Sequence, residues 1–264
     1  MPTLILRHIC YTQLDPTTWC ATAQFISPCL PNLWSGLGQP LTPISIGPLT
    51  HSTKLYEMLW QHYKPESSLS APAIAYNKRQ RQRRGVRLLL RTLLNKLNIT
   101  DTLDDTQFPY RLADSQRYVC FSHSATKVAV VINDRHPVGI DIETQDIAWQ
   151  VVQRFYHPAE ITVLAELPLE QRFITAKWLW QIKESFIKIY QYKLAQGLGI
   201  NYVAVTPYLL DILQKIDLNK AKLNNDSLYK ASLGEDRATV IVIDDNNSGY
   251  QIAILPYQQT IIVF

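Results

Sequence analysis

Apolar residues along the chain recur with two different periods, which together predict a mixed fold. A helical period marks residues 72–98, where Val86, Leu90, Leu93 and Leu97 fall on one face. Runs rich in β-branched and alternating apolar residues are typical of strands. They predict strands at 4–11, 118–121, 127–132, 138–143, 200–206, 238–243, 250–255 and 260–264.

A second helical region is predicted between residues 149 and 192. It is expected to break at His157-Pro158 and at Pro168, because proline cannot occupy a helix interior. The residues expected to form loops and turns are the Pro-rich stretch 28–48, the segment 133–137 and the segment Asp244 to Gly249.

These elements predict an α+β fold built as a pseudo-twofold pair of similar α/β subdomains. Each subdomain is expected to pack a long helix on a small, mostly antiparallel sheet. The division is placed between an N-terminal half, residues 1–135, and a C-terminal half, residues 136–264. An active site is then expected where the two halves meet.

Composition excludes several classes of protein. With 264 residues, of which 47% are hydrophobic, the chain can form a globular core. No apolar run approaches the roughly 20 residues of a membrane span, and the N-terminus lacks a signal-peptide layout, so a cytoplasmic protein without membrane contact is expected. The four cysteines form no C-x-x-C pair, which favours reduced and mostly buried thiols.

Positive charge is concentrated at the start of the first predicted helix, although the net charge is only +4. Three interpretations remain open here: a solvated basic face, a nucleic-acid surface, or a site for a small polyphosphate. The seven cations within fourteen residues are Lys78, Arg79, Arg81, Arg83, Arg84, Arg87 and Arg91.

The strand Gly139-Ile-Asp-Ile-Glu143 carries two carboxylates. Because side chains alternate along a strand, Asp141 and Glu143 share one face, about 7 Å apart. An ordinary exposed strand face is the simpler interpretation. Two neighbouring carboxylates repel each other unless a cation lies between them, however, and such oxygen ligands suit Mg²⁺.

The second long helix carries the charged segment Lys183-Glu-Ser-Phe-Ile-Lys188. Trp180, Glu184 and Lys188 recur every four residues and so share one face. The simpler interpretation is a stabilising Glu-Lys pair on a surface helix. Alternatively, Glu184 completes a metal site or acts as a base, while Lys183 and Lys188 neutralise phosphate oxygens.

Ser122-His123-Ser124 follows an extended run about fifteen residues before the acidic strand. A histidine between two serines is often structural. At the end of a strand, the same residues could direct hydroxyls, amides and an imidazole at an anion.

In this order and spacing, the three segments resemble the 4'-phosphopantetheinyl transferase superfamily, in particular its monomeric branch named for the enzyme that activates surfactin synthetase. The resemblance runs from about Arg81 to Gly199. It includes Pro109, thirteen residues before Ser122, and the segments 154–160 and 196–199.

The resemblance implies transfer of 4'-phosphopantetheine from coenzyme A to a serine of an apo acyl or peptidyl carrier protein, with release of 3',5'-ADP. Mg²⁺, or alternatively Mn²⁺, would be held by Asp141, Glu143 and Glu184. Glu184 is also implied as the base, with Asp141 and Lys188 completing the catalytic set. The residues implied to bind coenzyme A are Lys188 and Lys183 at the pyrophosphate, Arg81, Ser122 and His123 at the 3'-phosphate, and Pro109 beside adenine.

The resemblance also implies a monomer with no nucleic-acid partner, and places carrier binding at residues 151–161 with Phe155 and Tyr156. Two departures concern the adenine side, where Cys120 replaces a common asparagine and Gln107-Phe108 replaces glycine-lysine. Phe108 is therefore a candidate to stack on the base. The alternative functions are a nucleic-acid-binding protein that uses residues 78–91 and a carrier-binding relative without catalysis.

Overall fold

The computed structural model describes residues 4–26, 70–222, 239–242 and 249–264. The predicted loop at 28–48, Cys29 and residues 244–248 of the predicted turn lie outside the described residues. Among those described, no helix is long and apolar enough to cross a membrane. Cys20 and Cys120 are free and buried thiols, as predicted.

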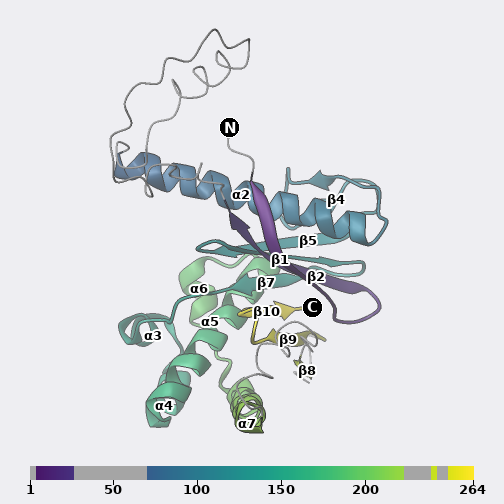
Figure 1. Ribbon diagram of the computed structural model, residues 1–264. Helices are drawn as coiled ribbons and strands as arrows, with labels where there is room; N and C mark the ends of the chain where they lie inside the picture. The colour runs from purple at the N-terminus through teal and green to yellow at the C-terminus, as the bar shows by residue number, and fades with distance from the viewer. Residues whose placement is uncertain (1–3, 27–69, 223–238, 243–248) are drawn as a thin grey trace, which may run out of the picture.

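The first sheet has six antiparallel strands in the order β1-β2-β6-β5-β4-β3. Its strands are β1 (Ile5–Gln13), β2 (Thr18–Ile26), β3 (Leu103–Asp104), β4 (Tyr110–Leu112), β5 (Tyr118–Ser124) and β6 (Lys127–Asn133). Helix α2 (Ala71–Lys96) lies across one face of this sheet (Figure 1). It begins with Pro72 in its first turn, where a missing N–H costs nothing.

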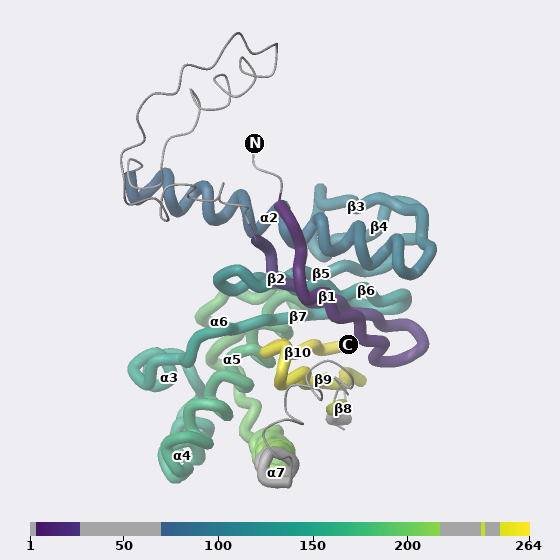
Figure 2. Tube along the Cα trace, viewed as in Figure 1, coloured from purple at the N-terminus to yellow at the C-terminus, as the bar shows by residue number. Residues whose placement is uncertain are grey.

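The second sheet has four antiparallel strands in the order β7-β10-β9-β8. They are β7 (Gly139–Ile142), β8 (Thr239–Val242), β9 (Gln251–Leu255) and β10 (Thr260–Val263). The helices of this half are α3 (Trp149–Phe155), α4 (Pro158–Glu166), α5 (Leu169–Tyr190), α6 (Leu194–Leu198) and α7 (Thr206–Lys222), with a short 3-10 turn, η2 (Val203–Val205). They gather on the side of this sheet away from α2 (Figure 2).

The two sheets face each other, so the molecule is layered as helix, sheet, sheet, helix. Alternation along each strand produces this arrangement. On β6, Val128 and Val130 pack toward α2, whereas Ala129 and Val131 pack between the sheets. β9 and β10 alternate in the same way between the inter-sheet core and the core around α5.

The expected α+β class, with antiparallel sheets and long helices, is confirmed. The predicted helix breaks at His157-Pro158 and Pro168 coincide with the ends of α3 and α4. The strands of the first sheet come from residues 5–133 and those of the second from 139–263. The domain division and the pseudo-twofold relation stay predictions.

The predicted strand at 200–206 is wrong, because this segment forms η2 and the start of α7. Its β-branched residues suggested a strand, but side chains satisfy its backbone donors. The Asn201 side chain accepts from the Val203 amide at 3.0 Å, and Glu160 accepts from the Tyr202 amide at 2.8 Å. Pattern reading also missed β2 and α7, although Leu209, Ile212 and Leu213 show helical spacing and are buried.

Gly139 allows α5 to pack directly on β7. A Cβ at this position would lie 2.1 Å from the Ser185 carbonyl oxygen, which belongs to the backbone of α5 and cannot swing aside. We expect Gly139→Ala to lower the free energy of unfolding by about 3 kcal/mol, measured in urea, because the helix must shift. Gly199→Ala is the matched control. Its Cβ would meet its nearest neighbour at 3.5 Å, an ordinary contact, so an equal loss in both variants would contradict the account.

Candidate active site

A cavity of about 750 Å³ opens where α2, β5, β7 and α5 come together. The structure brings the three predicted carboxylates, Asp141, Glu143 and Glu184, to its wall together with Lys188. Ser122 and His123 of β5 line the same cavity. Residues from both halves of the chain therefore meet at one site.

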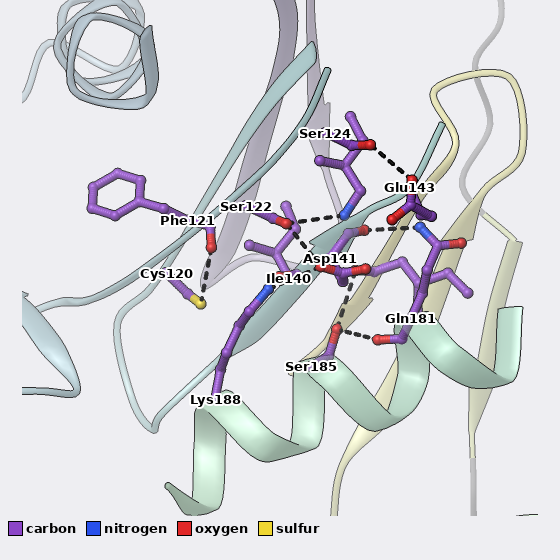
Figure 3. Close-up of polar contacts among 12 residues, drawn as sticks. Cys120, Phe121, Ser122, Ser124, Ile140, Asp141, Glu143, Gln181, Ser185 and Lys188 are labelled. Carbon is purple, nitrogen blue, oxygen red and sulfur yellow. Dashed lines mark hydrogen bonds and ion pairs between the residues drawn. The ribbon is translucent and has the colours of Figure 1, made fainter. Parts of the chain in front are cut away.

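Lys188 joins α5 to the acidic strand. Its Nζ donates to the Ile140 carbonyl oxygen at 2.6 Å and to Asp141 Oδ1 at 3.0 Å (Figure 3). Burial alone would lower the pKa of this amine, but the charge of Asp141 and its neighbours raises it above the ordinary value. Lys188 therefore stays a cation and points to β7, instead of pairing with Glu184 one turn away.

Asp141 is buried on the face of β7 that meets α5. The Ser122 hydroxyl donates to Asp141 Oδ1 at 2.8 Å and itself accepts from the Ile142 amide at 3.2 Å. Burial raises the pKa of Asp141, and the charge of Glu143 adds to the rise, although Lys188 opposes both. The hydrogen bond from Ser122 fixes the orientation of the carboxylate.

Glu143 follows the end of β7 and is held by its own turn. Its Oε1 accepts from the Ser124 hydroxyl at 2.8 Å and from the amides of Thr144 and Gln145 at 2.7 and 2.9 Å. The carboxylate is therefore fixed in place at the rim of the cavity.

Glu184 is the least constrained carboxylate of the three. We find no hydrogen bond to it from the part of the chain that the structure describes. Burial raises its pKa, and the negative charges of Asp141 and Glu143 raise it further against the effect of Lys188. A partly buried carboxylate with a raised pKa is suited to accept a proton.

Lys183 does not reach the cavity, contrary to the prediction that it binds phosphate. Its side chain is fully buried and forms an ion pair with Glu160, with Nζ to Oε2 at 2.9 Å. Nζ also donates to the carbonyl oxygens of Leu198 and Ile200. The physical reason is the helix geometry, since Lys183 lies about 100° around the helix from Glu184. Lys183 is thus a structural residue that joins α4 and α5 to the C-terminal end of α6.

Arg81 and Pro109 are likewise absent from the cavity wall, which instead includes Arg83, Arg87 and Phe108. Arg83 and Arg87 are four residues apart and so share one face of α2. Arg87 forms an ion pair with Asp105. Phe108 packs edge-on against Tyr110, with ring centroids 5.1 Å apart. The i, i+4 spacing alone would not have selected this pair from the seven cations, because Arg79 and Arg91 continue the same series.

His123 lines the cavity as an imidazole with a depressed pKa. Burial is the largest cause, and the positive charge of Lys188 acts in the same direction. The nearby carboxylates do not offset these effects. His123 is therefore biased toward its neutral form, in which one ring nitrogen donates and the other accepts.

Trp180 forms a second part of the wall, with Tyr156 behind it. Trp180 lines the cavity and stacks on Tyr156, with ring centroids 6.4 Å apart. Tyr156 is itself buried, and its hydroxyl donates to the Ala176 carbonyl oxygen at 2.7 Å. Tyr156 is one of the residues predicted to bind a carrier protein. It lies in the core, where it supports Trp180 from behind.

The three carboxylates of the cavity have the chemistry of ligands for a divalent metal. Within residues 4–26, 70–222, 239–242 and 249–264, no three His, Cys, Asp or Glu side chains already converge as metal ligands. Mg²⁺ is usually held by only one or two carboxylates, with water and substrate phosphate in the other positions. Burial raises the pKa values of Asp141 and Glu184, and the neighbouring carboxylates add to the rise, so a divalent cation between them would favour their charged forms. The residues therefore fit Mg²⁺ bound together with a phosphate-containing substrate.

Comparison with known proteins points to one class of enzyme. Residues 137–253 match the family described as the 4'-phosphopantetheinyl transferase superfamily. This match contains Asp141, Glu143, Glu184 and Lys188, and it ends before the close of β9.

One similar protein is the 4'-phosphopantetheinyl transferase gsp of Aneurinibacillus migulanus. It is 29% identical over 131 residues, which are 48% of this chain and 52% of the relative. The chain thus matches about half the length of that protein. Together the two matches support the superfamily and the phosphopantetheinyl transferase class, for the part of the chain that carries the carboxylates.

Proposed function

We propose that this protein transfers 4'-phosphopantetheine from coenzyme A to a serine of an apo acyl or peptidyl carrier protein, and that the reaction uses Mg²⁺ or Mn²⁺. In this proposal the protein is a cytoplasmic monomer and belongs to the surfactin-synthetase-activating branch. The observation that carries the proposal is the convergence of Asp141, Glu143, Glu184 and Lys188 on one cavity. The similarity to gsp supports the same reaction. The cavity volume of about 750 Å³ suits a ligand of nucleotide size.

In this proposal different residues of the cavity bind different parts of coenzyme A. Arg83 of α2 and His123 of β5, with Arg81 two residues before Arg83, provide positive charge and hydrogen-bond donors for the 3'-phosphate. Phe108 offers a ring face to adenine. Lys188 provides positive charge for the pyrophosphate, and its ion pair with Asp141, which Ser122 orients, holds it in place.

The chemical step joins the carrier serine oxygen to the phosphorus that bears pantetheine and breaks the bond from that phosphorus to 3',5'-ADP. Glu184 accepts the serine proton as the general base. When bound by Asp141, Glu143 and Glu184, Mg²⁺ would neutralise charge on the phosphate oxygens. Lys188 contributes positive charge to the same oxygens, and 3',5'-ADP leaves as an anion.

Two alternatives compete with transfer. A recess of about 250 Å³ on α2 is lined by Gln80, Arg83, Arg84 and Arg87. Its positive charge would also suit a polyanion such as nucleic acid. If this surface binds nucleic acid, its affinity for nucleic acid should fall steeply with salt concentration and should not depend on Mg²⁺. A carrier-binding relative would bind the carrier and leave its mass unchanged.

One incubation, followed by a binding measurement on the same carriers, tests transfer against the alternatives. The purified protein is mixed with coenzyme A, Mg²⁺ and a panel of apo carriers from fatty-acid, polyketide and nonribosomal-peptide systems, and the carriers are weighed by mass spectrometry. The proposal predicts that at least one carrier gains the mass of phosphopantetheine. Carrier binding without a mass gain would support the non-catalytic relative and contradict the proposal.

A further inference from the structure

Gln181 is a buried amide on α5 that faces the acidic strand, with 1% of its surface exposed. Its Nε2 donates to the Asp141 carbonyl oxygen at 3.2 Å and to the Gln259 carbonyl oxygen at 2.8 Å. Both partners can only accept, so the amide nitrogen must point toward them. Figure 3 shows Gln181, Ser185 and Lys188 on the side of α5 that meets β7.

The second partner, Gln259, belongs to the turn between β9 and β10 and has a left-handed backbone, with φ of 54°. Its carbonyl oxygen also accepts from the Glu143 amide at 3.1 Å. Its side-chain Oε1 accepts from Lys127 Nζ at 2.9 Å, which anchors the turn to β6. One amide on α5 is therefore bonded to the backbone of Asp141 and to the turn that holds Glu143.

Packing of α5 does not require this amide. The helix is already fixed by a buried apolar stripe that includes Leu179, Ile182 and Phe186. Gln181 Oε1 has no hydrogen-bond partner within the described residues, and a buried acceptor without a partner is unfavourable. An apolar residue would avoid that cost, so the two bonds from Nε2 are what a glutamine contributes here.

We propose that Gln181 is a positioning residue that fixes Glu184, three residues further along α5, relative to Asp141 and Glu143. The proposal rests on the function proposed above, in which these carboxylates act together on a metal-bound substrate. Lys188 connects the same helix to β7 on the side of Ile140. Gln181 adds the connection on the side of Glu143, so the three carboxylates are held from both ends of the strand.

The test compares Gln181→Met and Gln181→Glu with the native chain. Methionine keeps the volume and removes both donors, and glutamate keeps the shape but, when protonated, offers one donor in place of two. Thr175→Val is the matched control, because Thr175 is a buried polar residue of α5 whose Oγ1 has no partner within the described residues and which lies outside the cavity wall. Binding of Mn²⁺ in the presence of coenzyme A is measured by electron paramagnetic resonance, and transfer to a carrier by mass spectrometry.

We expect both Gln181 variants to bind Mn²⁺ about 10-fold to 100-fold more weakly and to lose kcat by a similar factor, since residues that orient metal ligands have effects of this size. The KM for the carrier should change less than about twofold, and Thr175→Val should match the native protein. Amide hydrogen exchange at Glu143 should be faster in the Gln181 variants alone, because the turn that holds this amide loses its hydrogen bond to α5.

Native Mn²⁺ affinity and native exchange at Glu143 in a folded Gln181 variant would overturn the positioning role while leaving the transferase proposal intact. A native protein that binds Mn²⁺ but transfers nothing would overturn the transferase proposal instead, and the affinity of the variants would still decide the role of Gln181. A native protein that binds no Mn²⁺ would overturn the positioning role. The Gln181→Glu variant keeps the test decisive if Gln181→Met fails to fold.

Discussion

Asp141→Asn is expected to lower transfer to a carrier protein on the order of a thousandfold. Asparagine keeps the shape, and its amide oxygen can still accept from Ser122, so the fold should be retained. The variant loses the charge that pairs with Lys188 and that would bind the metal. Metal ions supply several kcal/mol of transition-state stabilisation, and about 4 kcal/mol corresponds to a thousandfold change in rate.

The measurement for Asp141 is the initial rate of carrier modification at saturating coenzyme A, with circular dichroism to confirm folding. Asp146→Asn is the matched control, because Asp146 lies outside the cavity wall and pairs with Lys177 at the surface. It should keep close to the native rate. Native turnover by Asp141→Asn would contradict the role given to this carboxylate.

Lys183→Ala is expected to lower the free energy of unfolding by about 3–5 kcal/mol, because it leaves the Glu160 carboxylate buried without its cation. The carbonyl oxygens of Leu198 and Ile200 lose their donor as well. Unfolding in urea measures the loss. Lys177→Ala, six residues earlier on α5, removes only the partly exposed pair with Asp146 and should cost no more than about 1 kcal/mol.

The double variant Lys183→Met with Glu160→Gln removes both charges at once and should recover much of the stability lost by Lys183→Ala. If Lys183 bound phosphate, Lys183→Ala would instead lose activity while keeping the native free energy of unfolding. That outcome would restore the prediction made from the sequence.

The sequence was most informative where local rules decide the structure. Proline positions located the ends of α3 and α4, and alternation along 139–143 placed Asp141 and Glu143. Helical spacing identified the face of Glu184 and Lys188. Motif order suggested that these segments meet, and the cavity brings them together.

Long-range contacts could not be predicted from the sequence. Lys183 and Lys188 are both close to Glu184 in the sequence, so the sequence does not distinguish their roles. The fold does, because Lys183 forms a buried ion pair with Glu160, 23 residues earlier. The connection from Gln181 to Gln259 spans 78 residues and depends on the turn between β9 and β10. Arg83 and Arg87 are selected over Arg81 by how α2 rests on the first sheet.

The most direct test of the account is the mass of one apo carrier protein after incubation with coenzyme A and the native chain, with and without Mg²⁺, beside Asp141→Asn. The account predicts a carrier heavier by one phosphopantetheine group with the native chain and Mg²⁺, and almost no conversion in the same time without the metal or with the variant. An unchanged mass across fatty-acid, polyketide and peptide carriers, with a native chain that is folded, would contradict it.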